Sequence, residues 1–166
     1  MESQRLQRAL IVREPWAGYL VDGKKTWELR GTACHIRGRV GIAVAGQIIG
    51  EVRIVDCIKV AEQATDGSLV EVAGNEDCFP PLPANRPRHR VDDFQAFQWR
   101  CWHAWVVEDP VRYAEPVTYQ HKRGVVNWVK LDNVVEPEKH CSEPKPLKRP
   151  AAELSDGSRS DKSARL

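Results

Sequence analysis

Short apolar runs separated by turns predict several β-strands in the first sixty residues. Residues 9–12 are apolar, and residues 38–45 and 47–60 are rich in β-branched side chains, which favour strands. The glycines in residues 38–45 indicate bulges or tight bends. The length of residues 47–60 predicts one strongly bent strand, and such a bend fits the closure of a barrel.

A helix is predicted between the first two strands, over residues 15–21. Pro15 suits the first turn of a helix, and apolar residues follow it at helical spacing. Asp22 and Gly23 end the helix, because glycine suits the left-handed conformation of a C-terminal cap.

A second strand is predicted over residues 26–30, and its two faces differ in chemistry. Side chains in a strand point alternately to opposite sides. One face carries a hydroxyl, an acid and a base, and the other carries two large apolar groups: Thr26, Glu28 and Arg30 on the first, Trp27 and Leu29 on the second. Trp27 is expected to pack against the preceding helix. Lys25 lies where the turn becomes strand, so alternation does not fix its direction.

The middle of the chain gives weaker signals. Residues 61–74 fit no single element, and a short helix is one interpretation. Four prolines predict a loop over residues 75–90, whose end is basic. Residues 91–98 begin with acidic residues and predict a short helix.

Three further strands are predicted toward the C-terminal end, over residues 102–108, 111–119 and 124–131. Pro110 separates the first two, because proline lacks the N–H group that a strand ladder needs. The first of these strands has two apolar faces: Trp102, Ala104 and Val106 on one, His103, Trp105 and Val107 on the other.

These elements predict one α+β domain built on a small barrel with short flanking helices. Short strands, two helical pieces and many turns imply a highly curved sheet, and a barrel removes the exposed edges of such a sheet. We place the domain at residues 9–133, after an N-terminal arm at residues 1–8. Residues 134–166 are rich in Pro, Ser, Glu, Lys and Arg and contain no aromatic residue, so we predict a disordered tail with an unknown partner.

The charge balance of the chain excludes a strong global field. The 166 residues include 25 Lys and Arg against 23 Asp and Glu, a net charge of +2, so any nucleic-acid contact would need a local basic patch. No apolar run reaches the roughly 18 residues of a membrane span, and the polar N-terminus lacks a secretory segment. We expect a cytoplasmic monomer without membrane contact. The basic patch at residues 145–150 leaves nuclear import as an alternative to a solvated linker.

The cysteines favour a reducing compartment. Five cysteines are widely spread, none of them in a C-x-x-C pair, and their neighbouring histidines lack the spacing of a metal site. We therefore expect reduced cysteines, no metal and no cofactor.

Glu28 and Arg30 allow two interpretations. In the first, they form an ion pair that braces the mouth of the barrel, since isolated buried charge is expensive. In the second, Arg30 binds a phosphate or a base edge and Glu28 accepts a hydrogen bond from an exocyclic amine. Lys25 is either a solvated turn residue or, if desolvated, a candidate base.

The six tryptophans are mostly core residues in a barrel of this size. An indole can also stack on a base, which contributes roughly 1–3 kcal/mol. Trp16, at the start of the helix, is the first candidate for stacking and Trp105 is the second. Two basic loops, at residues 86–90 and 120–123, either hold phosphates or form plain solvated surface. Their candidate contacts are Arg88, Lys122 and Arg123.

Residues 23–30, Gly-Lys-Lys-Thr-Trp-Glu-Leu-Arg, resemble the G-x-K-x-x-E-x-R signature of the ASCH family within the PUA-like barrel superfamily. Gly23, Lys25, Glu28 and Arg30 occupy its four defined positions. The later strands also resemble those of bacterial-type members, and the likeness covers nearly all of residues 9–131. The segments that carry it are residues 49–52, 103–110, 115–119 and 124–129. The resemblance implies a PUA-like barrel and recognition of RNA or a nucleotide.

The resemblance to some small ASCH proteins also suggests an enzymatic activity. Such an enzyme would be an amidohydrolase that acts on N4-acetylcytidine and uses a lysine, a threonine and a glutamate. Lys25 matches the lysine. The position of the threonine, three residues later, holds Glu28, and Thr26 lies at a different place on the strand.

The first hypothesis is therefore a module that binds RNA, another single-stranded nucleic acid or a modified nucleobase. It would use a pocket at the mouth of the barrel, lined by the motif residues Lys25, Glu28 and Arg30. The second hypothesis is a nucleoside amidohydrolase or a ribonuclease, with Lys25 as base and Glu28 and Thr26 as partners. A protein-interaction adaptor with a vestigial pocket is the third.

Overall fold

The computed structural model describes residues 6–72 and 82–131, and within these ranges it shows one curved mixed sheet with short helices. The α+β class is confirmed. The predicted tail lies outside the described residues. The strands are β1 (Arg8–Ile11), β2 (Trp27–Arg30), β3 (Gly38–Val44), β4 (Gln47–Gln63), β5 (Leu69–Glu71), β6 (Cys101–Thr118) and β7 (Trp128–Lys130). The helical segments are α1 (Trp16–Val21), the 3-10 turn η1 (Leu82–Asn85) and α2 (Arg86–His89).

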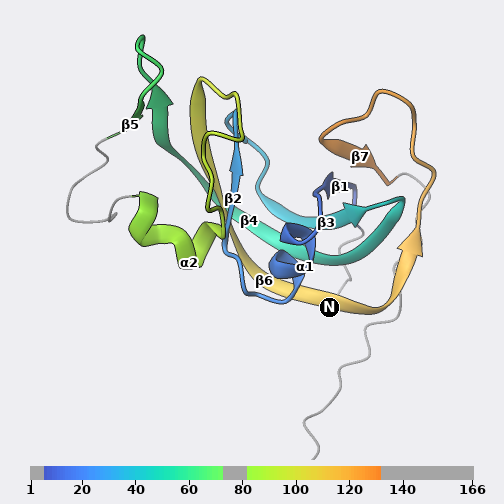
Figure 1. Cartoon of the computed structure of the whole chain (residues 1–166). Helices are drawn as coiled ribbons and strands as arrows, with labels where there is room; N and C mark the ends of the chain where they lie inside the picture. Colours follow the sequence, from blue (N-terminus) through green and yellow to red (C-terminus); the bar gives the residue numbers. More distant parts are fainter. Residues whose placement is uncertain (1–5, 73–81, 132–166) are drawn as a thin grey trace, which may run out of the picture.

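The sheet has the strand order β2-β6-β4-β3-β1-β7, and β5 pairs with β4. Only β1 and β3 pair in parallel among the described strands; the other pairs are antiparallel. The long strands β4 and β6 bend across the molecule, and α1 lies between the two ends of the sheet (Figure 1). Four register shifts interrupt the β4–β6 ladder, and such bulges bend a strand. The strongly bent strand predicted for residues 47–60 is thus confirmed.

Gly50 lies at one of these irregular positions and lets β4 pass close to β6 and α1. A Cβ atom at this position would overlap the carbonyl oxygen of Val111 and lie 2.7 Å from Cγ1 of Val21. Glycine is therefore required here by close backbone approach.

The predicted break at Pro110 is wrong, because β6 runs continuously through it. The β4–β6 ladder pairs Arg53 with Glu108 and Glu51 with Val111. Asp109, with a φ of 49°, and Pro110 fall in the bulge between these pairs. Proline is tolerated at a bulge, where no ladder hydrogen bond needs its missing N–H group.

Three other predictions for the middle of the chain also require correction. Residues 61–74 hold no helix in their described part: β4 continues to Gln63 and a tight turn leads into β5. Residues 82–90 are not a loop, because η1 and α2 form there with proline at the N-terminal end of α2, where a missing N–H costs nothing. Residues 91–98 form turns instead of a helix. The Asp93 carboxylate accepts from the backbone N–H of Gln95 at 2.9 Å, a local bond that competes with helix formation.

The predicted alternation of β6 is confirmed. Trp102 and Ala104 pack in one apolar cluster, while Trp105 and Val107 pack in another on the opposite face. Trp27 faces away from Glu28 as expected. It packs in the cluster that contains Leu82, Val91 and Trp102 and not, as predicted, against α1.

A closed barrel is not confirmed. Among the described residues no backbone ladder joins β2 to β1 or β7, so the sheet keeps a seam between its two ends. The side chains that cross this seam belong to the candidate site.

Candidate functional site

The charged side chains of the signature form one continuous buried ion chain. Lys25 Nζ lies 3.2 Å from Glu28 Oε2, and Arg30 Nε donates to Glu28 Oε1 at 3.0 Å. Lys25 is 2% exposed and Glu28 is 5% exposed. A buried carboxylate with a cation on each oxygen avoids the cost of isolated charge. This geometry matches the first interpretation of Glu28 and Arg30, in which the two side chains form an ion pair that braces the structure.

Arg30 continues this chain across the seam of the sheet. Its Nη2 donates to the Ile11 carbonyl of β1 at 2.8 Å, and its Nη1 donates to the Asn127 side chain, just before β7, at 3.1 Å. The guanidinium also lies 5.8 Å from the ring centre of Trp105, which stacks on Trp128 with an angle of 7° between the planes. The planar fork of arginine suits such a set of partners. Arg30 therefore ties the β2 end of the sheet to the β1–β7 end.

Lys25 extends the chain in the other direction, toward residues 86–90. Its Nζ donates to the His89 carbonyl at 2.8 Å. Two more bonds join the same segments: Thr26 N–H donates to the Arg88 carbonyl at 3.0 Å, and Arg90 Nε donates to the Lys24 carbonyl at 2.9 Å. Residues 86–90 are thus fixed to the start of β2.

Burial lowers the pKa of two groups at this junction. Burial lowers the pKa of Lys25, although the Glu28 carboxylate opposes that shift. Burial also lowers the pKa of His89, which is fully buried. The His89 ring bonds the Leu82 carbonyl through Nε2 at 2.8 Å and accepts from Val91 N–H at Nδ1 at 3.0 Å. These partners define the neutral tautomer with hydrogen on Nε2.

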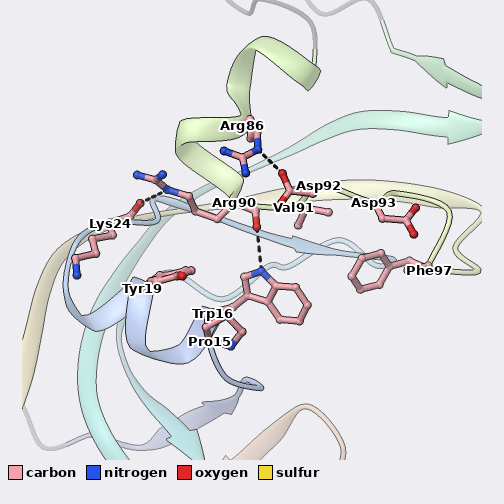
Figure 2. A pocket seen from close by; sticks show the side chains of 11 residues that line it. Pro15, Trp16, Tyr19, Lys24, Arg86, Arg90, Val91, Asp92, Asp93 and Phe97 are labelled. Carbon is pink, nitrogen blue, oxygen red and sulfur yellow. Dashed lines mark hydrogen bonds and ion pairs between the residues drawn. The ribbon is translucent and has the colours of Figure 1, made fainter.

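An open pocket of about 490 Å³ lies between α1 and residues 86–97. Figure 2 shows Trp16 in the middle of the pocket, with Tyr19 on one side and Phe97 on the other. The half-buried Trp16 donates from Nε1 to the Arg90 carbonyl at 3.1 Å, which fixes the indole plane. The residues that line the pocket are Pro15, Trp16, Tyr19, Lys24, Arg86, Arg90, Val91, Asp92, Asp93, Ala96 and Phe97.

The pocket carries charges of both signs. Lys24, Arg86 and Arg90 are exposed cations, and Asp92 and Asp93 are exposed acids. Arg86 pairs with Asp92, and its hydrogen bond lowers the pKa of that carboxyl. The pocket can therefore contact an anionic group through Lys24 and Arg90 and a hydrogen-bond donor through its acids.

The structure separates the predicted site residues into three groups. Trp16 lines the pocket. Arg88 does not line it, and its guanidinium lies 5.3 Å from the Trp27 ring centre. Lys25, Glu28 and Arg30 do not line this pocket but brace its surroundings, while Trp105 is 2% exposed and belongs to the core. Thr26 is exposed just before β2, and the exposed Lys122 and Arg123 lie between β6 and β7, outside the pocket.

Sequence reasoning missed Tyr19, Phe97 and the acids as pocket residues. Tyr19 lies among the apolar residues of the predicted first helix, and Asp92 and Asp93 lie at the start of the helix predicted over residues 91–98, so neither pattern indicates a pocket. No signal in the sequence brings Phe97 to Trp16, which it meets at a centroid distance of 6.2 Å. In the part of the chain that the structure describes, no helix is long and apolar enough to cross a membrane. No cluster of metal ligands occurs in residues 6–72 and 82–131.

Residues 10–77 match the family model of the ASCH domain, which confirms the resemblance seen in the signature. An ASCH protein from Zymomonas mobilis has a similar solved structure, with 16% identity, a TM-score of 0.44, and coverage of 66% of this chain and 69% of that one. Two of its mutant proteins are 18% and 15% identical, each with a TM-score of 0.40. They cover 68% and 76% of this chain and 73% and 89% of their own. No curated protein gives a significant match.

Replacing Arg30 by lysine should destabilise the domain, because lysine keeps the charge but cannot donate hydrogen bonds to three partners from one planar group. We expect a loss of about 2–3 kcal/mol in the free energy of unfolding, measured by urea denaturation. Arg53→Lys is the matched control: Arg53 is 45% exposed and pairs with Glu108 and Asp109 at the surface, so its effect should stay within about 0.5 kcal/mol. Equal effects of both variants would contradict the role of Arg30 at the seam.

The domain should lose stability as the pH falls from about 7.5 to about 5.5. The pKa of His89 is lower in the folded chain than its ordinary value of 6.5, so the unfolded chain binds more protons in this window. Protonation of Nδ1 also removes its acceptor for Val91. The pKa of His103 is lowered by burial in the same direction.

The measurement is the melting temperature at both pH values. His89→Gln should flatten the pH dependence, while His35→Gln, at an exposed position, should leave it unchanged. An unchanged slope in the His89 variant would refute the assignment of this pH dependence to His89.

Proposed function

We propose that this ASCH domain binds single-stranded RNA and takes one unpaired base into the pocket between α1 and residues 86–97. The observation that carries the proposal is the indole of Trp16, half-buried in an open pocket and fixed by its bond to the Arg90 carbonyl. ASCH domains have a PUA-like fold, and this fold is associated with RNA binding. The pocket volume of about 490 Å³ lies in the usual range of ligand sites.

Stacking on aromatic rings is the usual way in which proteins hold unpaired bases. Trp16 offers such a ring, and Tyr19 and Phe97 add aromatic surface beside it. The ring of Phe97 is tilted by 52° to the indole, so the two rings do not form a parallel sandwich. We therefore assign the stacking contact to the indole and the enclosing contacts to the other two rings.

Cations at the rim would hold the backbone of the RNA. Lys24 has a side chain that is 62% exposed, and Arg90 extends over the Lys24 backbone with one nitrogen used in that bond. The Arg86 charge is compensated by Asp92. Lys122 and Arg123, in the loop before β7, are further candidates for a strand that leaves the pocket. Phosphate contacts of this kind give affinity without sequence specificity.

The signature residues support this site indirectly. Lys25 donates to the carbonyl of His89, and the same segment supplies Arg90, whose carbonyl accepts from Trp16. The lysine thereby positions one wall of the pocket without touching its contents. In this proposal Lys25, Glu28 and Arg30 determine the shape of the site, and the aromatic and basic lining residues contact RNA.

Replacing Trp16 by alanine should weaken RNA binding by roughly 5- to 150-fold, since a stacked base contributes roughly 1–3 kcal/mol. The measurement is fluorescence anisotropy with a short labelled single-stranded RNA at one fixed salt concentration. Trp16→Phe should keep part of the affinity because a ring remains. Arg53→Ala, outside the pocket, is the control and should bind like the unchanged protein.

The duplex of the same sequence should bind more weakly than the single strand, because its bases are not available for stacking. Arg90→Ala should lower the slope of log affinity against log salt by about 0.7, the value for one phosphate contact on a single strand. Full affinity in the folded Trp16→Ala protein would overturn the proposal.

Hydrolysis of N4-acetylcytidine or of RNA is a second candidate, favoured by the lowered pKa of Lys25. A general base needs such a shift. The ammonium is bonded to the His89 carbonyl and paired with Glu28, so a substrate would have to displace these partners.

Lys25→Arg keeps the charge but removes the base, and its folding can be checked by circular dichroism. Chromatography of N4-acetylcytidine and of single-stranded RNA after incubation should show product that this variant abolishes. No product, or product that survives the substitution, eliminates the candidate.

A further inference from the structure

Two cysteines from different segments of the chain lie in contact. Cys34 lies in the segment between β2 and β3, and Cys57 lies in β4. The backbone N–H of Cys34 donates to Cys57 Sγ at 3.2 Å. Both thiols are reduced. Cys34 belongs to the buried apolar cluster around α1, and the half-buried Cys57 packs against that cluster.

The separation of the two residues suits a disulfide. Backbone N and Cα of one residue are about 1.46 Å apart, so Cα of Cys34 lies at most about 4.7 Å from the sulfur of Cys57. A disulfide needs a Cα–Cα distance of about 4.4–6.8 Å, which is compatible with this contact. Because the contact already brings the backbone of Cys34 to the sulfur of Cys57, we expect the bond to form by rotation of side chains without a rearrangement of the sheet.

The surroundings assign different roles to the two thiols. Burial raises the pKa of the Cys34 thiol, against the smaller opposing effects of Arg37 and Arg8. Its sulfur faces the Ile36 carbonyl at 3.8 Å. Cys57 is the more exposed of the two, so a small oxidant in solution reaches it first. Cys34 is then the second thiol, which resolves the oxidised sulfur.

We propose that Cys34 and Cys57 form an oxidisable pair that a hydroperoxide converts to an intramolecular disulfide. The thiolate of Cys57 attacks the peroxide oxygen, the O–O bond breaks, and a sulfenic acid forms with release of water or an alcohol. The sulfur of Cys34 then attacks that of Cys57, the S–O bond breaks, and the departing hydroxide leaves as water with the proton of Cys34. The two thiols lose two electrons and two protons, and the peroxide is reduced. A small thiol reverses the reaction by exchange.

The bond would fix the segment after β2 to the middle of the sheet. In this segment the Thr32 carbonyl accepts from Nε1 of Trp105 at 2.9 Å, and Trp105 is the β6 residue paired with Cys57. Arg37 donates to the Cys34 carbonyl at 2.9 Å and pairs with Asp56, the neighbour of Cys57. Oxidation would thus cross-link two segments that already share several contacts.

The test uses the full chain with the other three cysteines replaced by serine: Cys78, Cys101 and Cys141. The protein is treated with hydrogen peroxide, its remaining thiols are alkylated, and its mass and peptides are determined by mass spectrometry. We expect loss of two hydrogen masses, no alkylation, and one cross-linked peptide that joins Cys34 to Cys57. Reduction with dithiothreitol should restore two alkylatable thiols. The oxidised protein should also melt at a higher temperature than the reduced one.

A matched variant keeps Cys57 and Cys101 and carries Cys34→Ser. Cys101 is also half-buried and also belongs to the sheet, but it pairs with Glu62 of β4 while Cys57 pairs with Trp105, so it should give no internal disulfide. Oxidation of Cys57 in this variant should stop at the sulfenic acid or proceed to the sulfinic acid. The proposal is overturned if the variant cross-links as readily as the Cys34–Cys57 protein. It is also overturned if peroxide leaves Cys34 alkylatable while Cys57 is oxidised.

Discussion

The carboxylate of Glu28 is the group on which the organisation of this domain depends. It is almost completely buried and stands between the ammonium of Lys25 and the guanidinium of Arg30. Such a group is stable in the interior only when both cations remain in place. Each cation in turn binds a different part of the molecule, so one carboxylate connects the wall of the pocket with the seam of the sheet.

This arrangement changes the meaning of the signature. A spacing of three and then two residues places Lys25 and Arg30 on either side of Glu28, and alternation along β2 explains why Glu28 and Arg30 share a face. Most side chains that line the pocket come from other places, namely α1, its flanking Pro15 and residues 86–97, and Lys24 at a variable position of the signature joins them. The defined positions Lys25, Glu28 and Arg30 thus form a support and do not line the pocket.

Local pattern predicted those parts of the fold that depend on neighbouring residues. The helix before Gly23, the faces of β6 and the long bent β4 follow from periodicity and from glycine, and all three are present. The predicted strand break at Pro110 is wrong because the effect of this proline depends on the register of the β4–β6 ladder, which places it in a bulge. The helix predicted over residues 91–98 does not form, because side chain–backbone bonds and aromatic packing prevail over the helical pattern. The ring of Phe97 reaches Trp16 only through the tertiary fold, so no local rule places both in one pocket.

The partners of Arg30 have a consequence for synthesis of the chain on the ribosome. The amide oxygen that it bonds belongs to Asn127, 97 positions later, and β2 pairs with β6, whose residues are also made long afterwards. Contacts between residues so distant in sequence form slowly and late. Until translation has passed Asn127, the N-terminal half of the chain therefore has an unpaired strand, and its three charged signature side chains are not yet buried among their final partners. In this interval the chain is most exposed to aggregation and to chaperones.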